Sequence, residues 1–242
     1  MAARLNQFLF IAMKARIIIF LFSALSVFII SCRNSETDGD AGFGDLYLDC
    51  KVWSEEGSEN ATLKLQFRIG GPEGRTTRLP ETAKVELDGI QLKADSAKLE
   101  GPYYEAVLPL KEFAGTHSIR YTSPGAKVYE DSFSFVPFTL DPEMPAVMTR
   151  GDLVFTFKGL DAEDYLRVWL SDTLFTSDDI NDIDTIRNGK LVIHRERLAT
   201  IAGGPINLQF HKEAQLPFRR ITPAGGRIYI TYTLKRMFEL RG

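Results

Sequence analysis

Apolar and polar residues alternate along most of the chain after residue 45, and this period of two predicts β-strands. The first such segment is LYLDCKVW, whose apolar positions are Leu46, Leu48, Cys50 and Val52. A second segment, LKLQFRI (63–69), alternates in the same way. Further strands are expected at residues 84–88, 90–94, 103–110, 118–122 and 128–135.

Glycine- and proline-containing turn signals separate these segments, for example GGPEG at 70–74, EGP at 100–102 and SPG at 123–125. About seven short strands in about 90 residues, each with one polar face, are typical of an immunoglobulin-like β-sandwich. We therefore predict a first sandwich domain over residues 45–138.

A proline-rich segment, PFTLDPEMP (137–145), then interrupts the pattern and predicts a boundary or a stiff crossover between domains. The alternation restarts at 152–159 and continues at 164–172, 190–193, 206–211 and 227–240. Within it, RERLATIAGG (195–204) predicts one or two helical turns that stop at glycine. The fold class expected is all-β, with a second immunoglobulin-like sandwich over residues 139–242.

The N-terminal segment has the composition of a secretory signal. Lys14 and Arg16 precede an apolar run, 17–30, of about 14 residues, which is shorter than the roughly 20 that a membrane-spanning helix needs. We predict a signal peptide over residues 1–31, of which 1–12 form an upstream extension. The segment 32–44, rich in Ser, Asp and Gly, is expected to be a flexible tether.

The end of the signal, Ile29-Ile30-Ser31-Cys32, resembles a loose form of the bacterial lipobox. That resemblance implies that Cys32 becomes the first mature residue and carries fatty acyl chains such as palmitate, which anchor a protein stably when there are two or more. The alternative is that Cys32 only ends a hydrophobic anchor. The acidic stretch after Cys32 also resembles the surface-export signal of Bacteroidota lipoproteins.

The C-terminal half carries a second resemblance. The segment TSDDINDIDTIRNGKLVIHRERLATIAGGPINLQFHKE, followed by GGRIYITYTLKRMFEL, is similar to the last domain of uncharacterised tandem-sandwich lipoproteins of Bacteroidota. Together with residues 13–45, this resemblance implies an outer-membrane lipoprotein on the periplasmic or the surface-exposed face. It implies no particular chemistry.

Charge and cysteine content agree with that location. The chain has a formal net charge of -3, and removing residues 1–31 takes away Arg4, Lys14 and Arg16, which leaves -3 - 3 = -6. An acidic mature chain argues against nucleic acid as a partner. Cys50 is the only cysteine after Cys32, so no internal disulfide framework is expected.

No motif for catalysis was found, and no cofactor is expected. The chain has neither a G-x-S-x-G elbow nor an H-E-x-x-H or H-x-H pair, and its three histidines, at 117, 194 and 211, are far apart. Cys50 lies on an apolar strand face and is interpreted as a small buried side chain. A hydrolase would need two carboxylates about 5–10 Å apart in a cleft, and no spacing marks such a pair.

An acidic connection, SDTLFTSDDINDID (171–184), is a weak candidate for a calcium site. Its carboxylates could supply the hard oxygen ligands that calcium prefers. The spacing departs from the EF-hand pattern, and solvated acidic loops are common on secreted β proteins. The candidate ligands are Asp178, Asp179, Asp182 and Asp184.

Aromatic residues on the polar strand faces form the candidate binding surface. By parity, Tyr165, Arg167 and Trp169 share one strand face, and Tyr47 and Trp53 share another. Tyr, Trp and Arg are enriched at binding hot spots, and aromatic rings also stack on sugars. The alternative is that the neighbouring domain or a loop covers these rings.

The sequence thus favours a lipid-anchored, non-enzymatic interaction or scaffold module that contacts an unknown protein or glycan at the outer membrane. This inference from fold to function is an analogy. The alternative is a glycan-binding accessory protein of a surface uptake system, which predicts exposed aromatic rings about one sugar apart.

Overall fold

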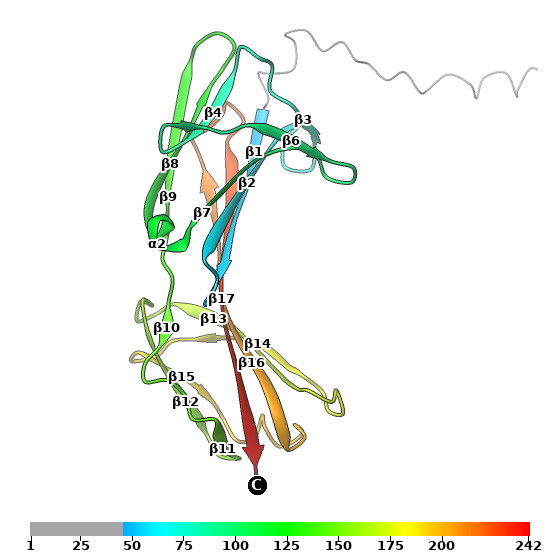
Figure 1. Cartoon of the computed structure of the whole chain (residues 1–242), viewed down its shortest axis with the longest axis vertical. Helices are drawn as coiled ribbons and strands as arrows, with labels where there is room; N and C mark the ends of the chain where they lie inside the picture. The colour runs from blue at the N-terminus through cyan, green and yellow to red at the C-terminus, as the bar shows by residue number, and fades with distance from the viewer. Residues whose placement is uncertain (1–45) are drawn as a thin grey trace, which may run out of the picture. The chain divides into compact units, whose positions relative to one another are not determined.

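The computed structural model describes residues 46–242, which fold into strands in two sandwiches (Figure 1). Residues 46–138 contribute β1 (Leu46–Glu55), β2 (Asn60–Ile69), β3 (Arg75–Thr77), β4 (Lys84–Leu87), β5 (Ile90–Gln91), β6 (Ala94–Ala97), β7 (Gly101–Pro109), the short helix α2 (Leu110–Phe113), β8 (Gly115–Thr122) and β9 (Val128–Phe135). Residues 139–242 contribute β10 (Thr139–Leu140), β11 (Val147–Thr149), β12 (Leu153–Lys158), β13 (Tyr165–Asp172), β14 (Ile180–Thr185), β15 (Lys190–Ile193), β16 (Gly204–Phe218) and β17 (Gly226–Arg241).

The first sandwich has the strand order of an immunoglobulin fold. One sheet contains β1-β2-β7-β6, and the facing sheet contains β5-β4-β8-β9. In chain order these are strands A-B-E-D and C′-C-F-G, the arrangement that defines the fold. The core between them contains Phe67, whose ring centroid lies 5.7 Å from that of Tyr104 and 5.3 Å from that of Tyr121.

The second sandwich follows the same plan. Strands β10-β12-β15 form one sheet, equivalent to A-B-E, and β14-β13-β16-β17 form the other, equivalent to C′-C-F-G. Phe210 of β16 is fully buried between them, with its ring centroid 5.0 Å from that of Phe155 and 5.1 Å from that of Phe157. The predicted all-β fold class with two immunoglobulin-like sandwiches in tandem is confirmed.

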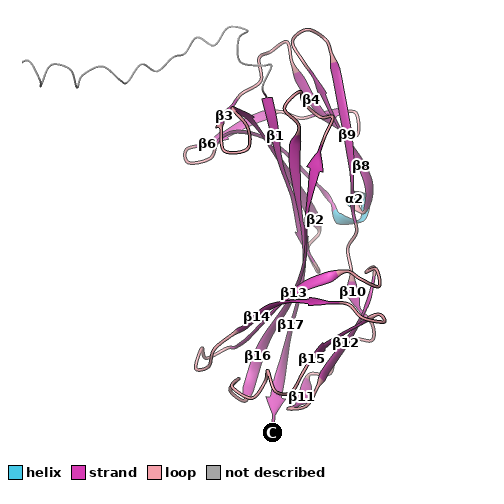
Figure 2. Ribbon diagram, turned by 180° about the vertical axis from the view of Figure 1, so that it is seen from behind, coloured by secondary structure: helices cyan, strands magenta, loops and turns pink. Residues whose placement is uncertain are grey.

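The two sandwiches share one sheet, because β16 and β17 are unusually long. The last part of β17 belongs to the second sandwich, while its first part pairs in parallel with β1 from Leu48↔Gly226 to Glu55↔Thr233. The result is a ten-stranded sheet with the central order β14-β13-β16-β17-β1-β2-β7-β6. Figures 1 and 2 show β16 and β17 running from one sandwich into the other. The predicted boundary at 138 and 139 falls between β9 and β10, and it remains a prediction, since strand pairing crosses it.

Burial follows the alternation predicted from the sequence. Leu48, Cys50 and Val52 of β1 are at most 1% exposed, whereas Lys51 and Trp53, which follow Cys50 and Val52, are exposed. This is the expected result when successive side chains of a strand point to opposite faces. We call the face of the ten-stranded sheet that points away from both cores the outer face.

The predicted helical turns are present: residues 195–201 form successive turns in which several N–H groups bond to the carbonyl three residues before them, such as Leu198 N to Arg195 O, without forming an α-helix. Leu198 and Ile201 are buried, so the predicted apolar side of that segment exists. One local prediction was wrong. The acidic connection is not a loop throughout, because residues 180–184 of it belong to strand β14.

Within residues 46–242, no helix has the length and apolar character needed to cross a membrane. The signal peptide, Cys32 and the tether of residues 32–44 lie outside the described residues.

Candidate functional site

The five candidate surface residues lie on one face of one sheet, although they come from two sandwiches. Tyr47 and Trp53 are on β1, and the other three are on β13. The register connects them: Arg167 of β13 pairs with His211 of β16, which pairs with Thr233 of β17, which pairs with Glu55 of β1. Residues in one such row share a face, and so do residues two positions away along each strand. The structure therefore places both groups of residues on the outer face.

The side chains on this face are accessible in the described part of the chain. Trp53 is 41% exposed, Trp169 is 40% exposed and Tyr165 is 49% exposed. Tyr47 and Arg167 are partly buried. The alternative that a neighbouring domain covers the two indole rings does not agree with these values.

The two tryptophans are too far apart to bind a single sugar ring together. Trp53 pairs with Thr231 of β17. Trp169 pairs with Gln209 of β16, which in turn pairs with Lys235 of β17. They are thus separated by four residues along the strands and three strands across the sheet. With spacings of about 3.4 Å per residue and 4.8 Å per strand, the separation is roughly 20 Å.

Polar contacts orient the β13 side chains. Trp169 donates from its indole Nε1 to Asp179 Oδ2 at 2.9 Å. Arg167 donates from Nε to Glu213 Oε2 on β16 at 3.2 Å, and from a terminal nitrogen to Asn181 on β14 at 3.3 Å. These partners hold the indole and the guanidinium against the sheet, which reduces the side-chain entropy that a binding partner would have to overcome.

A buried carboxylate organises the β1 end of the face. Asp49 is 5% exposed and accepts hydrogen bonds from Arg68 Nε at 3.1 Å and from Arg227 Nε at 3.1 Å. The Asp49 carboxylate raises the pKa of the Arg227 guanidinium. One carboxylate thus joins β1 to a neighbour on each side, β2 and β17. Its cross-strand partner Gln66 lies beside this cluster.

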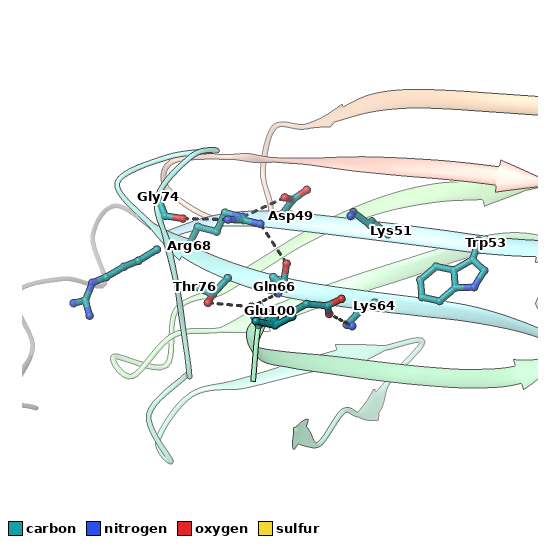
Figure 3. A pocket seen from close by; sticks show the side chains of 11 residues that line it. Asp49, Lys51, Trp53, Lys64, Gln66, Arg68, Gly74, Thr76 and Glu100 are labelled. Atoms are coloured by element: carbon teal, nitrogen blue, oxygen red, sulfur yellow. Dashed lines mark hydrogen bonds and ion pairs between the residues drawn. The ribbon is translucent and has the colours of Figure 1, made fainter. Parts of the chain in front are cut away.

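Two hollows adjoin Trp53 on the outer face. The first has a volume of about 680 Å³ and lies over β1 and β2, against Gly74 and Glu100 (Figure 3). The second has a volume of about 590 Å³ and lies on the other side of the ring, over Thr62 and Thr231. Sequence parity could place Trp53 on a polar face, but the first hollow also depends on residues 74–76 and 99–100, whose positions alternation does not predict.

A further hollow, of about 450 Å³, brings together residues that the sequence treated separately. Tyr165 and Ile183 of the second sandwich line it together with Tyr229 of β17. Tyr229 pairs with Lys51 of β1. The aromatic surface is therefore wider than the five predicted residues, and Tyr229 could have been found from the alternation of the last strand.

The four calcium candidates are not brought together. Asp179 contacts Trp169, whereas Asp182 and Asp184 both contact Arg197, the latter at 2.7 Å. Because alternate residues of a strand point to opposite faces, Asp182 and Asp184 lie on the opposite side of β14 from the outer face. Asp178 is exposed. The acidic run thus forms separate side-chain contacts in the structure.

Asp172, at the start of the same run, is a buried turn residue. It accepts hydrogen bonds from the Ser177 hydroxyl at 2.6 Å and from the backbone amides of Leu174, Thr176 and Ser177. These donors, the Ser177 hydroxyl first, lower the pKa of Asp172 to about 2.

The cysteine and histidines have structural surroundings. Cys50 is fully buried, and burial raises the pKa of its thiol well above the ordinary value. His117 is buried and contacts Asp88 and the Phe113 carbonyl. Burial also lowers the pKa of His211, whose Nδ1 lies 2.9 Å from the Thr233 hydroxyl.

One group of potential metal ligands was missed, because its members are distant in sequence. Asp152, His194 and Glu196 have ligand atoms within 4.8 Å of one another, and all three are exposed. Asp152 Oδ1 accepts the backbone N–H of Arg195 at 2.9 Å, and Arg195 contacts Glu196 at 3.1 Å. The Asp152 carboxylate thus caps the turn that begins at Arg195, and Arg195 and Glu196 form an ion pair on the surface beside it.

No protein-family model matches the chain, and no curated protein matches it in sequence. Among solved structures, it is similar to a tetra-tandem repeat in the extending region of a large adhesion protein, with 9% identity, a TM-score of 0.24, and coverage of 80% of this chain and 49% of that chain. It is also similar to the adhesin InvE of Yersinia pseudotuberculosis, with 14% identity, a TM-score of 0.21, and coverage of 80% and 61%. The chain thus spans about half the length of the first. Similarities this low do not identify a function, and the immunoglobulin-like assignment rests on the strand order.

Proposed function

We propose that this chain is a lipid-anchored cell-envelope protein that binds a partner through the outer face of its ten-stranded sheet and has no catalytic activity. The observation that carries this proposal is the convergence of Tyr47, Trp53, Tyr165, Arg167 and Trp169 on one exposed face. The shared sheet gives that face a breadth that neither sandwich has alone.

The residue types on the face support binding. About two fifths of the surface of each tryptophan is in water, and covering that surface with a partner favours binding by roughly 25 cal/mol per Å² of apolar area. Tyr, Trp and Arg dominate binding hot spots because they combine large contact areas with hydrogen-bonding groups. Met237 and Val107, which are 67% and 55% exposed, extend the apolar content of the same face.

The absence of catalysis is part of the proposal. The one thiol of the described residues, Cys50, is buried on the opposite face of β1 and has a raised pKa, so it is not poised as a nucleophile. The carboxylate at the centre of the β1 cluster, Asp49, is engaged by two arginines.

Attachment through Cys32 is the second part of the proposal, and it is supported by the lipobox-like sequence. Cell fractionation of wild type and Cys32→Ala tests it directly. We expect the wild-type chain in the membrane fraction and the variant in the soluble envelope fraction. A variant that stays in the membrane fraction would show that acylation of Cys32 is not the anchor.

Site-specific photo-crosslinking tests the binding face. A photoreactive amino acid is placed at Trp53 or Trp169 in cells that produce the chain, and at Val128 as a control. Val128 is 55% exposed but belongs to β9 of the other sheet. We expect adducts from the two outer-face positions only. Equal crosslinking from Val128, or none from either tryptophan position, would remove the outer face as the binding surface.

A glycan-binding accessory protein is the second candidate function. The specific observation in its favour is the hollow beside Trp53, which is lined by hydroxyl and amide side chains, including Ser58, Asn60, Thr62 and Thr231. Such groups can satisfy sugar hydroxyls. Binding to a polysaccharide array that is lost in Trp53→Ala would favour this function over contact with a protein.

A further inference from the structure

The larger hollow beside Trp53 is polar, although its size is that of a ligand site. Its volume of about 680 Å³ is within the usual range of roughly 300–1,000 Å³, but most such pockets are lined by apolar side chains. Here the lining includes Asp49, Lys51, Lys64, Gln66 and Arg68. An apolar ligand would leave these groups without water, so the occupant has to be polar.

The charges around the hollow do not balance. Asp49 neutralises only one of its two arginines, Arg68 and Arg227, and Glu100 neutralises Lys64. Lys51 is exposed and forms no ion pair with any of residues 46–242. Among these six side chains, positive charges outnumber negative ones by two, in a chain whose net charge is -3. This local excess favours an anionic occupant.

The side chains follow β1 in an order that fits an extended occupant. Figure 3 shows Arg68 at one end of the hollow, Lys51 and Lys64 further along, and Trp53 at the far end. Because Lys51 and Trp53 are two residues apart on one strand, they are separated by about 7 Å. Beyond Trp53 the second hollow continues the track to Glu55.

A peptide fits this track less well than a sugar chain. One common mode of peptide binding adds a strand to a free sheet edge, and that mode is closed here because β1 is paired with β2 on one side and β17 on the other. Its backbone groups are therefore already used. A sugar chain can bind through side chains alone. The negative face of an indole attracts the C–H groups of a sugar ring, and hydroxyl and amide side chains next to Trp53 can bond to the sugar hydroxyls.

We propose that this hollow binds an acidic oligosaccharide built from uronic acid sugars, with one ring on Trp53 and a neighbouring carboxylate at Lys51. The single positive charge of the Lys51 ammonium is matched by one carboxylate, and the competing ligands below separate this class from sulfated sugars. This inference rests on the proposal that the outer face is the binding face.

The test measures binding of galacturonic acid oligomers to the full chain in detergent by calorimetry. The control ligand is the same oligomer with its carboxylates methyl-esterified, which keeps the sugar backbone and removes the charge. We expect binding of the free acid that weakens as salt rises. Equal binding of the ester would overturn the role of charge.

Two variants locate the site. Lys51→Gln removes one charge from an exposed side chain, and Trp53→Ala removes the ring; each should weaken binding about tenfold or more. Lys111→Gln, at an exposed lysine of α2, is the matched charge control and should leave affinity unchanged. Unchanged affinity in Lys51→Gln would overturn the proposal, and circular dichroism checks that Trp53→Ala is folded.

Competing ligands complete the test. Tighter binding of heparin fragments of equal length would assign the hollow to sulfated glycans, and tighter binding of a glutamate peptide would assign it to acidic protein; either result overturns the uronic acid assignment. If galacturonic acid oligomers fail to bind while crosslinking at Trp53 and Trp169 succeeds, the outer-face proposal remains and this inference fails. If both fail, both are wrong.

Discussion

A core substitution in the second sandwich should destabilise the first sandwich as well, because the two share β16 and β17. Phe210 is the appropriate site, since its ring is fully buried against Phe155 and Phe157. Removing a buried Phe side chain costs about 3–5 kcal/mol through lost contacts and the cavity that remains. We predict that Phe210→Ala lowers the stability of both sandwiches by this amount.

The two tryptophans of the chain allow each sandwich to be followed separately. Trp53 is on β1, which belongs to the first sandwich, and Trp169 is on β13, which belongs to the second. Fluorescence in a Trp169→Phe background therefore reports on the first sandwich alone, and Trp53→Phe gives the reverse. With a urea slope of about 2–3 kcal/mol per M, Phe210→Ala should lower both midpoints by roughly 1–2.5 M.

The result that would refute the reasoning is specific. If the Trp53 midpoint is unchanged while the Trp169 midpoint falls, the sandwiches unfold independently and the β1–β17 ladder does not couple them. Phe67→Ala is the reciprocal control, because Phe67 is fully buried in the first sandwich between Tyr104 and Tyr121. It should lower both midpoints in the same way.

Three further predictions concern single buried groups. Asp49→Asn should cost about 1–3 kcal/mol in urea unfolding, because Arg227 loses a charged acceptor in a partly buried cluster; a loss below about 0.5 kcal/mol would contradict the role of the cluster. Asp172 has a folded pKa of about 2 against an ordinary value of 3.8, so its stabilisation should be present above pH 4 and lost as the pH falls toward 2. Asp172→Asn should flatten that part of the stability curve, and an unchanged curve would show that titration of Asp172 is not its cause. Cys50 should react with a thiol reagent only after denaturation, and rapid labelling of the folded chain would show that β1 opens.

Strand faces could be predicted from the sequence because side-chain alternation is a local property of an extended chain. The prediction that Tyr165, Arg167 and Trp169 share a face needed only their spacing, and the register has them at alternate positions of β13. The acidic strand β14 was missed because Asp is unfavourable in strands. Tertiary contacts override that preference here: β14 pairs with β13 over six residues, and Arg197 holds two of its carboxylates.

The shared sheet could not be predicted in this way, because it depends on pairing between distant segments. Asp49 and Arg227 are 178 positions apart, and no local pattern marks them as partners. The length of β16 was also missed, because the alternation was followed only over 206–211, whereas the strand runs from Gly204 to Phe218 and contains Pro217, a residue type that usually ends a strand. Pro217 is tolerated because β13 stops pairing with β16 at His211, which leaves the rest of β16 at the sheet edge, where a missing N–H breaks no ladder bond.

The register of the β1–β17 ladder decides whether an outer face exists at all. A slip of one residue would turn Trp53 and Lys51 into the core and expose Cys50 and Val52. The ladder begins at Leu48↔Gly226, where a side-chain carbon on residue 226 would lie 2.5 Å from the Leu48 carbonyl oxygen. Only glycine fits that approach without moving the backbone, because real Cβ atoms do not come this close. The glycine that opens the last strand therefore permits the register that presents Trp53 and Lys51 to the same side as Trp169. The proposed binding face depends on Gly226, although that residue is itself buried.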